Sequence, residues 1–284
     1  MKKYNDLTIF FVSYYSRKNI EKLIKKINKK IKILIIDNAQ ENDLKFYFRK
    51  KHKNVEVLTC KYNSGQTGGI NICLKRIKTK FAIYMDSDVS FASNTIDRFL
   101  QIADKIKDFI ILAPQHEKSF YKKEFFSEKK SEFPNFDLMK IVHGQFLFFK
   151  MKNVKKVGYY DENIFLYFDE TDFCLRAYRK NQKIYVIPSI KVKHKGGSSV
   201  DLENTLEIEC NKHWHYMWSK FYYHKKNYSL INAYENTMFD LFASFLKIFI
   251  FFFIDSRKSR INYNKFLGLV NSYLGYKSYK RIRL

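Results

Sequence analysis

Two short acidic clusters lie in apolar surroundings in a strongly basic chain. The first, Asp86-Ser87-Asp88, follows the apolar residues 81–85, and the second, Asp-Glu-Thr-Asp at 169–172, lies inside the aromatic-rich stretch 165–176. Side chains alternate along a strand, so two carboxylates separated by one residue at a strand end point to the same face. Such a face offers hard oxygen ligands for Mg²⁺ or Mn²⁺ bound together with a phosphate. The second cluster could supply a general base across the same cleft.

Strand and helix patterns alternate through the first half of the chain, which predicts an α/β fold. Repeated βα units with short connections imply a mostly parallel sheet with helices on both faces, and ligands bind beyond the carboxyl ends of such strands. Asp37 and the first acidic cluster follow two of these strands. The expected strands are 7–13, 31–36, 55–59, 81–85 and 109–113, and the expected helices are 18–28, 43–51, one through Ile70 and Leu74, and 94–107.

The second half of the chain has a different pattern of expected elements. We expect a surface loop at 115–140, a strand at 141–150, a helix from Glu170 to about Lys180, and short strands at 184–187 and 191–194. From residue 202 onward the pattern is helical. These patterns predict a catalytic α/β domain over 1–228 and a C-terminal helical extension over 229–284.

Composition limits the partners. The formal net charge is +25, from 53 Lys+Arg against 28 Asp+Glu, which favours an anionic partner: nucleic acid, a membrane surface or a phosphorylated substrate. The lysines are scattered, and neither an RNA-reading aromatic motif nor zinc-finger spacing is present, so we expect no nucleic-acid partner.

Cysteine spacing and the N-terminus favour a cytoplasmic location. The four cysteines, Cys60, Cys73, Cys174 and Cys210, lack metal-ligand or redox spacing, so we expect free thiols in a reducing compartment. The apolar stretch 7–12 is too short for a signal peptide and has no small-residue cleavage site after it.

In their order along the chain, the motifs resemble those of the family-2 glycosyltransferases with the GT-A fold, closest to the bacterial rhamnosyltransferase-like branch that builds surface polysaccharides. The likeness covers about residues 7–228, and the order of the pieces carries more weight than any one of them. The pieces are Val12-Ser13-Tyr14, Ile36-Asp37-Asn38, Asn63-Ser64-Gly65 through Gly69-Ile70-Asn71, Asp86-Ser87-Asp88, Gly144, Gly158-Tyr159-Tyr160-Asp161-Glu162, the run 165–176, and His194 before Gly196-Gly197-Ser198-Ser199. The resemblance implies one Rossmann-like GT-A domain with a mostly parallel sheet.

The resemblance also implies roles for individual residues. It places the donor contacts at Tyr14, Asp37, Asn63, Gly65, Gly69, Asn71 and Asp86, the divalent cation (Mg²⁺ or Mn²⁺) at Asp88, Asp86 and His194, and the catalytic acidic motif at Asp169, Glu170 and Asp172. Matching by position puts the base at Glu170 and leaves Asp169 as its rival, because the family more often shows Glu-Asp than Asp-Glu.

Each motif also has a structural explanation that stays open. Asp37 could cap the following helix, the glycines could form an ordinary turn, and His194 could be a hydrogen-bonded core histidine. The second acidic cluster could be favoured simply by the dipole of the helix that it begins.

The activity implied by the resemblance is inverting, metal-dependent sugar transfer. The donor would be a UDP- or dTDP-sugar, with dTDP-rhamnose as one candidate, and the acceptor a hydroxyl of a surface polysaccharide or a lipid-linked glycan. One alternative is a nucleotidyltransferase, but its basic signature loop should contain glycine, whereas residues 13–17 read Ser-Tyr-Tyr-Ser-Arg. A second is a non-catalytic membrane-bound binding protein, which the nearly intact acidic motifs disfavour. A homo-oligomer is left open.

The C-terminal stretch 239–254 is apolar apart from Asp240, Ser244 and Lys247. As a helix it would span about 24 Å at about 1.5 Å per residue, less than the ~30 Å hydrocarbon core of a bilayer. Basic residues follow at Arg257, Lys258 and Arg260. We expect this stretch to hold the enzyme on the anionic inner face of the cell membrane. The alternative is that it packs on the catalytic domain or on a second copy of the chain.

Overall fold

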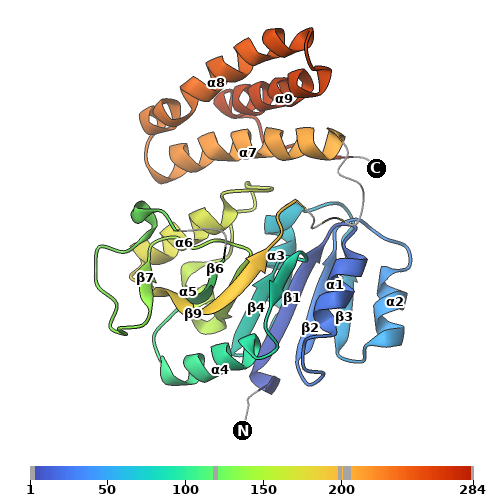
Figure 1. Ribbon diagram of the computed structural model, residues 1–284, viewed down its shortest axis with the longest axis vertical. Coiled ribbons are helices and arrows are strands. Elements are labelled where there is room, and N and C mark those ends of the chain that lie inside the picture. Colours follow the sequence, from blue (N-terminus) through green and yellow to red (C-terminus); the bar gives the residue numbers. More distant parts are fainter. Residues whose placement is uncertain (1–3, 118–120, 198–199, 201–205, 283–284) are drawn as a thin grey trace. The chain divides into compact units, whose positions relative to one another are not determined.

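The computed structural model of the protein describes residues 4–117, 121–197, 200 and 206–282 (Figure 1). The chain divides into two compact units. The first unit comprises Met1–Ser64, Gly68–Tyr160 and Phe173–Asp201, and the second comprises Gly65–Thr67, Asp161–Asp172 and Leu202–Leu284. Ser198 and Ser199, which belong to the glycine-serine motif after His194, lie outside the described residues.

The first unit is built on a sheet whose N-terminal half is parallel. Its strands β1 (Leu7–Ser13), β2 (Lys32–Asp37), β3 (Val55–Thr59) and β4 (Phe81–Met85) lie in the order β3-β2-β1-β4. Apolar runs fill β1, β2 and β4, since side chains on both faces of a helix-covered parallel sheet are buried. Strands β1, β3 and β4 have the predicted bounds.

Helices cover both faces of this sheet. On one face, α1 (Arg17–Ile24), α2 (Leu44–Lys51) and α4 (Thr95–Lys105) bury apolar side chains against the strands. On the other, α3 (Gly65–Arg76), α5 (Met151–Val157) and α6 (Asp169–Arg179) do the same through residues such as Leu74, Val154 and Phe173. The predicted alternation of strands and helices is thus confirmed, and α5 is an additional helix where the sequence pattern predicted none.

The other half of the sheet is mixed. Strand β8 (Phe146–Lys150) is antiparallel to both β4 and β6 (Ile111–His116), while β6 is parallel to β9 (Ile184–His194). The short strands β5 (Val89–Phe91) and β7 (Asp137–Met139) are antiparallel to β9. The two short strands expected at 184–187 and 191–194 are one strand, with a register shift opposite Pro114 and Gln115 of β6. The expected loop at 115–140 includes β7.

The second unit contains three long helices: α7 (Leu206–Asn227), α8 (Leu230–Phe252) and α9 (Ser256–Tyr273). Phe221, Ala233 and Leu269 are buried together, one from each helix. A Cβ on Gly268 would lie 2.3 Å from the carbonyl oxygen of Trp214, so glycine is what allows α9 to cross α7 this closely. Because α7 packs with α8 and α9, the compact units do not coincide with the predicted division into 1–228 and 229–284.

The tail after α9 folds back onto α7. The indole N–H of Trp218 donates to the carbonyl of Tyr276 at 2.9 Å, and the ring nitrogens of His215 lie 3.0 Å from Ser278 Oγ and 2.8 Å from the carbonyl oxygen of Lys280. A carbonyl can only accept, so His215 carries its proton on Nε2, and Nδ1 accepts from the serine hydroxyl. Among the described helices, none has the length and apolar character needed to cross a bilayer.

Candidate active site

Asp86, Asp88 and His194 form a cluster of three candidate metal ligands in the first unit. Each side chain offers one ligand atom, and these atoms all lie within 4.8 Å of one another. The imidazole Nε2 of His194 is 3.0 Å from a carboxylate oxygen of Asp88 and 3.8 Å from one of Asp86. Two carboxylates and one imidazole are a donor set that suits Mn²⁺ or Mg²⁺. The residues predicted from sequence to bind the cation are therefore brought together.

Strand pairing explains this convergence of distant residues. The backbone N–H of Asp86 donates to the carbonyl of Gln145 at 2.9 Å, which continues the β4–β8 pairing past the end of β4. The chain then turns into β5, whose Val89 is the register partner of His194 on β9. Asp88 and His194 are therefore neighbours because the three-residue strand β5 pairs with the end of β9.

The immediate surroundings shape the cluster's charge. The hydroxyl of Tyr84 donates a short hydrogen bond to Asp86, and Asp88 itself is buried. The hydrogen bond to Asp88 raises the pKa of His194, with the negative charges of Asp88 and Asp86 acting in the same direction. This arrangement concentrates negative charge where a cation would bind.

Asp37 lies at the carboxyl end of β2 and is fully buried. Its carboxylate accepts the backbone N–H of Ala39 at 3.0 Å, so it stabilises the turn after the strand. Burial raises the pKa of Asp37, and hydrogen bonds from that turn and from Thr59 oppose the rise. The N-cap residue of α2 is Asp43, so Asp37 does not cap that helix. A contact to the donor base stays a prediction.

The predicted donor loop has tight local packing. A Cβ on Gly69 would lie 2.7 Å from Cγ1 of Val12, and one on Gly65, where φ is +74°, would lie 2.4 Å from the carbonyl oxygen of Phe165. Both positions therefore require glycine for packing alone. Asn63 precedes α3, and Tyr14 follows β1 in contact with Tyr15 at 5.1 Å between ring centroids.

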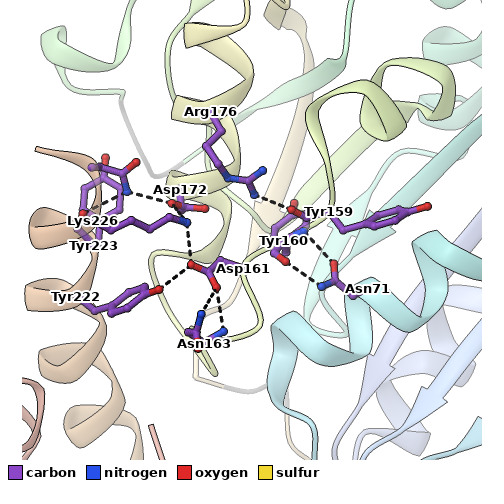
Figure 2. Close-up of polar contacts among 11 residues, drawn as sticks. Asn71, Tyr159, Tyr160, Asp161, Asn163, Asp172, Arg176, Tyr222, Tyr223 and Lys226 are labelled. Atoms are coloured by element: carbon purple, nitrogen blue, oxygen red, sulfur yellow. Dashed lines mark hydrogen bonds and ion pairs between the residues drawn. The ribbon is translucent and has the colours of Figure 1, made fainter. Parts of the chain in front are cut away.

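Asn71 has a structural role in the first unit (Figure 2). Its side-chain amide donates to the carbonyl of Tyr160 and accepts from the backbone N–H of Tyr160, both at 2.9 Å. The guanidinium of Arg176 donates to the carbonyl of Tyr159 at 2.7 Å, and the ring of Tyr160 stacks on Phe173 at 4.6 Å. These contacts hold the backbone at 159–160. A contact between Asn71 and the donor stays a prediction.

The second acidic motif begins α6 in the second unit. Tyr167 and Phe168, directly before the helix, both have positive φ values, +65° and +63°, which are strained for bulky side chains. Asp169 is 2% exposed, whereas Glu170 is partly exposed. Burial raises the pKa of Asp169 well above its usual range, and the charge of Glu170 raises it further. The two neighbouring carboxyl groups thus differ sharply in environment.

Asp172, the third acid of the motif, is tied to α7 (Figure 2). Its side chain is fully buried, pairs with the ammonium of Lys226 at 2.7 Å and accepts from the amide of Asn227 at 3.0 Å. Lys226 also pairs with Asp161 at 2.7 Å, and Asp161 accepts from the hydroxyl of Tyr222 at 2.9 Å. This network, in which Asp172 is buried and Lys226 partly exposed, links residues 161–172 to α7 inside the second unit.

Sequence reasoning did not identify Tyr84, Lys226 or Asn227. Tyr84 alternates with Asp86 on the face of β4, which a strand pattern could have indicated. Along the chain, strand β9 lies between Asp172 on α6 and the two partner residues, Lys226 and Asn227, on α7, and nothing in their local sequence signals the contact. His116 and His143 also lie in the first unit, with their ring centroids 5.5 Å apart. Burial lowers the pKa of His116 to about 4.

Comparison with known proteins gives matches in both sequence and structure. The sequence profile of glycosyl transferase family 2 matches residues 8–158, just over half of the chain. The low-salt glycan biosynthesis hexosyltransferase Agl10 of Haloferax volcanii is 22% identical over 203 residues, covering 63% of this chain and 64% of that protein. The chain therefore spans less than two thirds of the length of this relative.

Solved structures share the fold at low identity. The mannosyltransferase PcManGT from Pyrobaculum calidifontis, solved in complex with GDP-Man and Mn²⁺, superposes with a TM-score of 0.60 at 12% identity, covering 95% of this chain and 87% of that one. Residues 1–349 of TarS from S. aureus in complex with UDP-GlcNAc give a TM-score of 0.53 at 15% identity, with 95% and 92% covered.

Proposed function

From the premise that this chain is a glycosyltransferase belonging to glycosyl transferase family 2, we propose that it transfers a sugar from a nucleotide-diphosphate donor with inversion at the anomeric carbon and with a bound divalent cation. The observation that carries the proposal is the cluster of Asp86, Asp88 and His194, whose ligand atoms lie within 4.8 Å of one another. The two carboxylates are ligands that suit Mn²⁺ or Mg²⁺, and the imidazole could complete the site.

Asp88 and His194 would hold the cation, and Asp86 would share it or bind the ribose. A cation in this place supplies charge neutralisation for the departing nucleotide diphosphate. The hydrogen bond from Tyr84 would orient the carboxylate of Asp86 toward the cation, as outer partners of metal ligands commonly do.

Glu170 is the catalytic base in this proposal. It would accept the proton of the acceptor hydroxyl while that oxygen attacks the anomeric carbon and the diphosphate departs. The base needs an accessible carboxylate, and Glu170 is partly exposed whereas Asp169 is buried. Burial raises the pKa of Asp169, which favours its protonated form and makes the more accessible Glu170 the better candidate for the base.

The donor would be a UDP- or dTDP-sugar, with dTDP-rhamnose as one candidate. Tyr14, Asp37, Asn63, Gly65 and Gly69 would bind it at the carboxyl ends of the parallel strands. Asn71 would act indirectly by holding the backbone of Tyr160. Nucleotide sugars in two solved relatives, GDP-Man in PcManGT and UDP-GlcNAc in TarS, support this class of donor.

The acceptor would be a hydroxyl of a surface polysaccharide or of a lipid-linked glycan. The hexosyltransferase Agl10, named for low-salt glycan biosynthesis, supports a glycan acceptor. A cytoplasmic enzyme working on such an acceptor would act at the inner face of the cell membrane.

Nucleotide-diphosphate titration with and without Mn²⁺ tests the cation site. Asp88→Asn should lose the Mn²⁺-dependent part of UDP or dTDP binding, because an amide is a poorer ligand for a hard cation. Asp104→Asn, an exposed aspartate on α4, is the matched control and should bind as the wild type does. Equal Mn²⁺ dependence in Asp88→Asn and the control would remove the cation assignment.

Transfer from a panel of radiolabelled nucleotide sugars tests the reaction and identifies the donor. Glu170→Gln should keep donor binding but lose turnover by roughly 10²–10⁴-fold, the usual contribution of a general base. If Glu170→Gln turns over normally while Asp169→Asn is inactive, the base is Asp169.

A further inference from the structure

Helix α8 has its small and polar side chains on the inside. Ala233, Thr237 and Ser244 are buried toward the rest of the second unit. The hydroxyl of Thr237 donates to the carbonyl of Ala233 at 2.7 Å, and the hydroxyl of Tyr273 on α9 lies 2.8 Å from it. The hydroxyl of Ser244 donates to the carbonyl of Leu241. The side of α8 that packs on the protein therefore needs little of the helix's apolar surface.

Large apolar side chains occupy the opposite side instead. Phe239 is 82% exposed and Phe253, one residue past the helix, is 90% exposed. We call this surface the apolar face of α8; it consists of the exposed residues Met238, Phe239, Phe242, Phe245, Leu246, Phe249, Ile250, Phe252, Phe253 and Ile254. Their spacing of three and four residues makes one continuous stripe along the helix.

The area of this face exceeds what a monomeric protein usually exposes. Its phenylalanines alone expose on the order of 800 Å², taking about 200 Å² for a whole aromatic side chain. The largest apolar patch on an ordinary monomer is about 300–600 Å², and larger patches mark interaction sites. A patch of this size marks the apolar face of α8 as an interaction site.

Basic residues border the same end of the helix. Between residues 245 and 260 the charged residues are Lys247, Asp255, Arg257, Lys258 and Arg260, an excess of positive charge. Arg257 and Arg260 pair with Glu209 and Glu207 of α7, and Lys258 pairs with Asp255, so the four exposed basic residues exceed these three acids by one positive charge. The border therefore keeps a small positive excess in a chain whose formal net charge is +25, which favours an anionic partner surface.

We propose that the apolar face of α8 binds the surface of an anionic lipid bilayer, with the helix lying in the plane of the interface. The phenylalanines would enter the boundary between headgroups and acyl chains, and the basic border would contact acidic headgroups. None of the described helices could cross a bilayer, which fits an in-plane placement. The purpose of this binding, to meet a lipid-linked acceptor, rests on the proposed function, whereas the binding itself does not.

Charge favours lipid over a second copy of the chain as the covering partner. In a dimer with two-fold symmetry, the same patch meets itself. The positive border of one copy would then approach the positive border of the other, and this repulsion disfavours association. An anionic bilayer neutralises the same residues.

Vesicle co-sedimentation of the full chain tests the proposal. Phosphatidylcholine vesicles are compared with vesicles that contain 30% phosphatidylglycerol. The wild type should bind the anionic vesicles and lose affinity at high salt. The variant Phe239→Ser/Phe249→Ser/Phe253→Ser should bind them at least ~100-fold more weakly, because each ring buries apolar area in the interface. The matched control, Phe46→Ser/Tyr62→Ser, removes two aromatic side chains that are each 71% exposed in the first unit, and should bind normally.

A second readout does not depend on loss of binding. Both native tryptophans, Trp214 and Trp218, are buried, so Phe249→Trp adds one exposed fluorophore. Its emission should shift to the blue with anionic vesicles and be quenched by lipids brominated on the acyl chains. Sedimentation velocity without lipid measures the oligomeric state in parallel.

Equal vesicle binding by wild type and triple variant, or no binding by the wild type, would overturn the proposal. A stable dimer that the triple variant dissociates, together with no vesicle binding, would assign the face to a second copy. Mn²⁺-dependent binding of nucleotide diphosphate, measured on the same samples, should be equal in all variants. If the wild type shows no Mn²⁺-dependent nucleotide-diphosphate binding, that result counts against the proposed function. The conclusion about lipid binding does not depend on it.

Discussion

The ion pair between Asp172 and Lys226 should be one of the most important polar contacts in the second unit. Lys226→Met keeps the length and apolar stem of the side chain but removes the ammonium, which lies 2.7 Å from both Asp172 and Asp161. Asp172 is fully buried and would keep its hydrogen bond from Asn227 but lose the charge of the ammonium. Removing one partner of a buried pair costs about 3–5 kcal/mol, because the other charge stays buried and uncompensated.

The expected loss here is smaller than that range. The side chain of Lys226 is 28% exposed, so water screens part of the interaction. We expect Lys226→Met to lower the free energy of unfolding by about 2–3 kcal/mol. For a chain of this size that corresponds to a fall of roughly 4–12 °C in Tm.

Urea unfolding followed by circular dichroism measures this loss. The matched control is Arg76→Met, which breaks an ion pair with Glu56 in which both side chains are half exposed. Exposed pairs contribute only about 0–1 kcal/mol, so this variant should unfold almost as the wild type does. Asp172→Asn in the Lys226→Met background should recover part of the stability, because it removes the uncompensated charge. If Lys226→Met and Arg76→Met lose the same small amount, the network does not stabilise the unit as argued.

Three other changes should have measurable effects. His215 is buried with its pKa lowered to about 3, against an ordinary value near 6.5, so the folded state favours the neutral ring. The stabilisation from the neutral ring is fully present above pH 6.5. As pH falls below that value, the wild type should lose free energy of unfolding relative to His215→Gln by up to about 1.4 kcal/mol per pH unit. Identical pH slopes of the unfolding free energy in the two proteins would contradict this. Gly69→Ala should destabilise the protein by about 1–3 kcal/mol, since the new Cβ would lie 2.7 Å from Cγ1 of Val12; the check is the urea midpoint, and a midpoint equal to that of the wild type would contradict the packing argument. Tyr84→Phe removes the hydrogen bond to Asp86 and should weaken Mn²⁺ binding, measured by calorimetry, about 10–100-fold; unchanged affinity would mean that Tyr84 does not orient this ligand.

The parallel half of the sheet was predictable because its signal is local. Strands β1 and β4 are short apolar runs, β3 alternates between buried and exposed residues at its start, and all three have the predicted bounds. The antiparallel part was harder. Strand β5 has three residues, too few for a periodic pattern, yet it pairs with β9 and brings His194 to Asp88. Motif order identified these ligands from the sequence, but it could not show the pairing of β5 with β9 that brings them together.

The acidic motif shows the same division between what is local and what is not. The helix start at Asp169 follows from sequence, but the separate environments of its three carboxylates depend on distant residues. The carboxylate of Asp172 is buried and pairs with Lys226. No local sequence pattern indicates this contact. For α8, the sequence showed the apolar stretch, whereas the side of the helix that is exposed follows only from the packing of Thr237 and Ser244.

The division of the chain into units has a consequence for synthesis on the ribosome. Residues Gly65–Thr67 and Asp161–Asp172 belong to a unit whose remaining part begins at Leu202. Asp172 thus leaves the ribosome before its partners Lys226 and Asn227 exist. At a synthesis rate of about 5–20 residues per second, several seconds pass between synthesis of the acidic motif and synthesis of the end of α7. Strands β1–β4 are all synthesised before the motif. Ribosome-bound chains that end before α7 should therefore hold strands β1–β4 and a helix α6 whose first turn is not yet stabilised by Lys226 and Asn227.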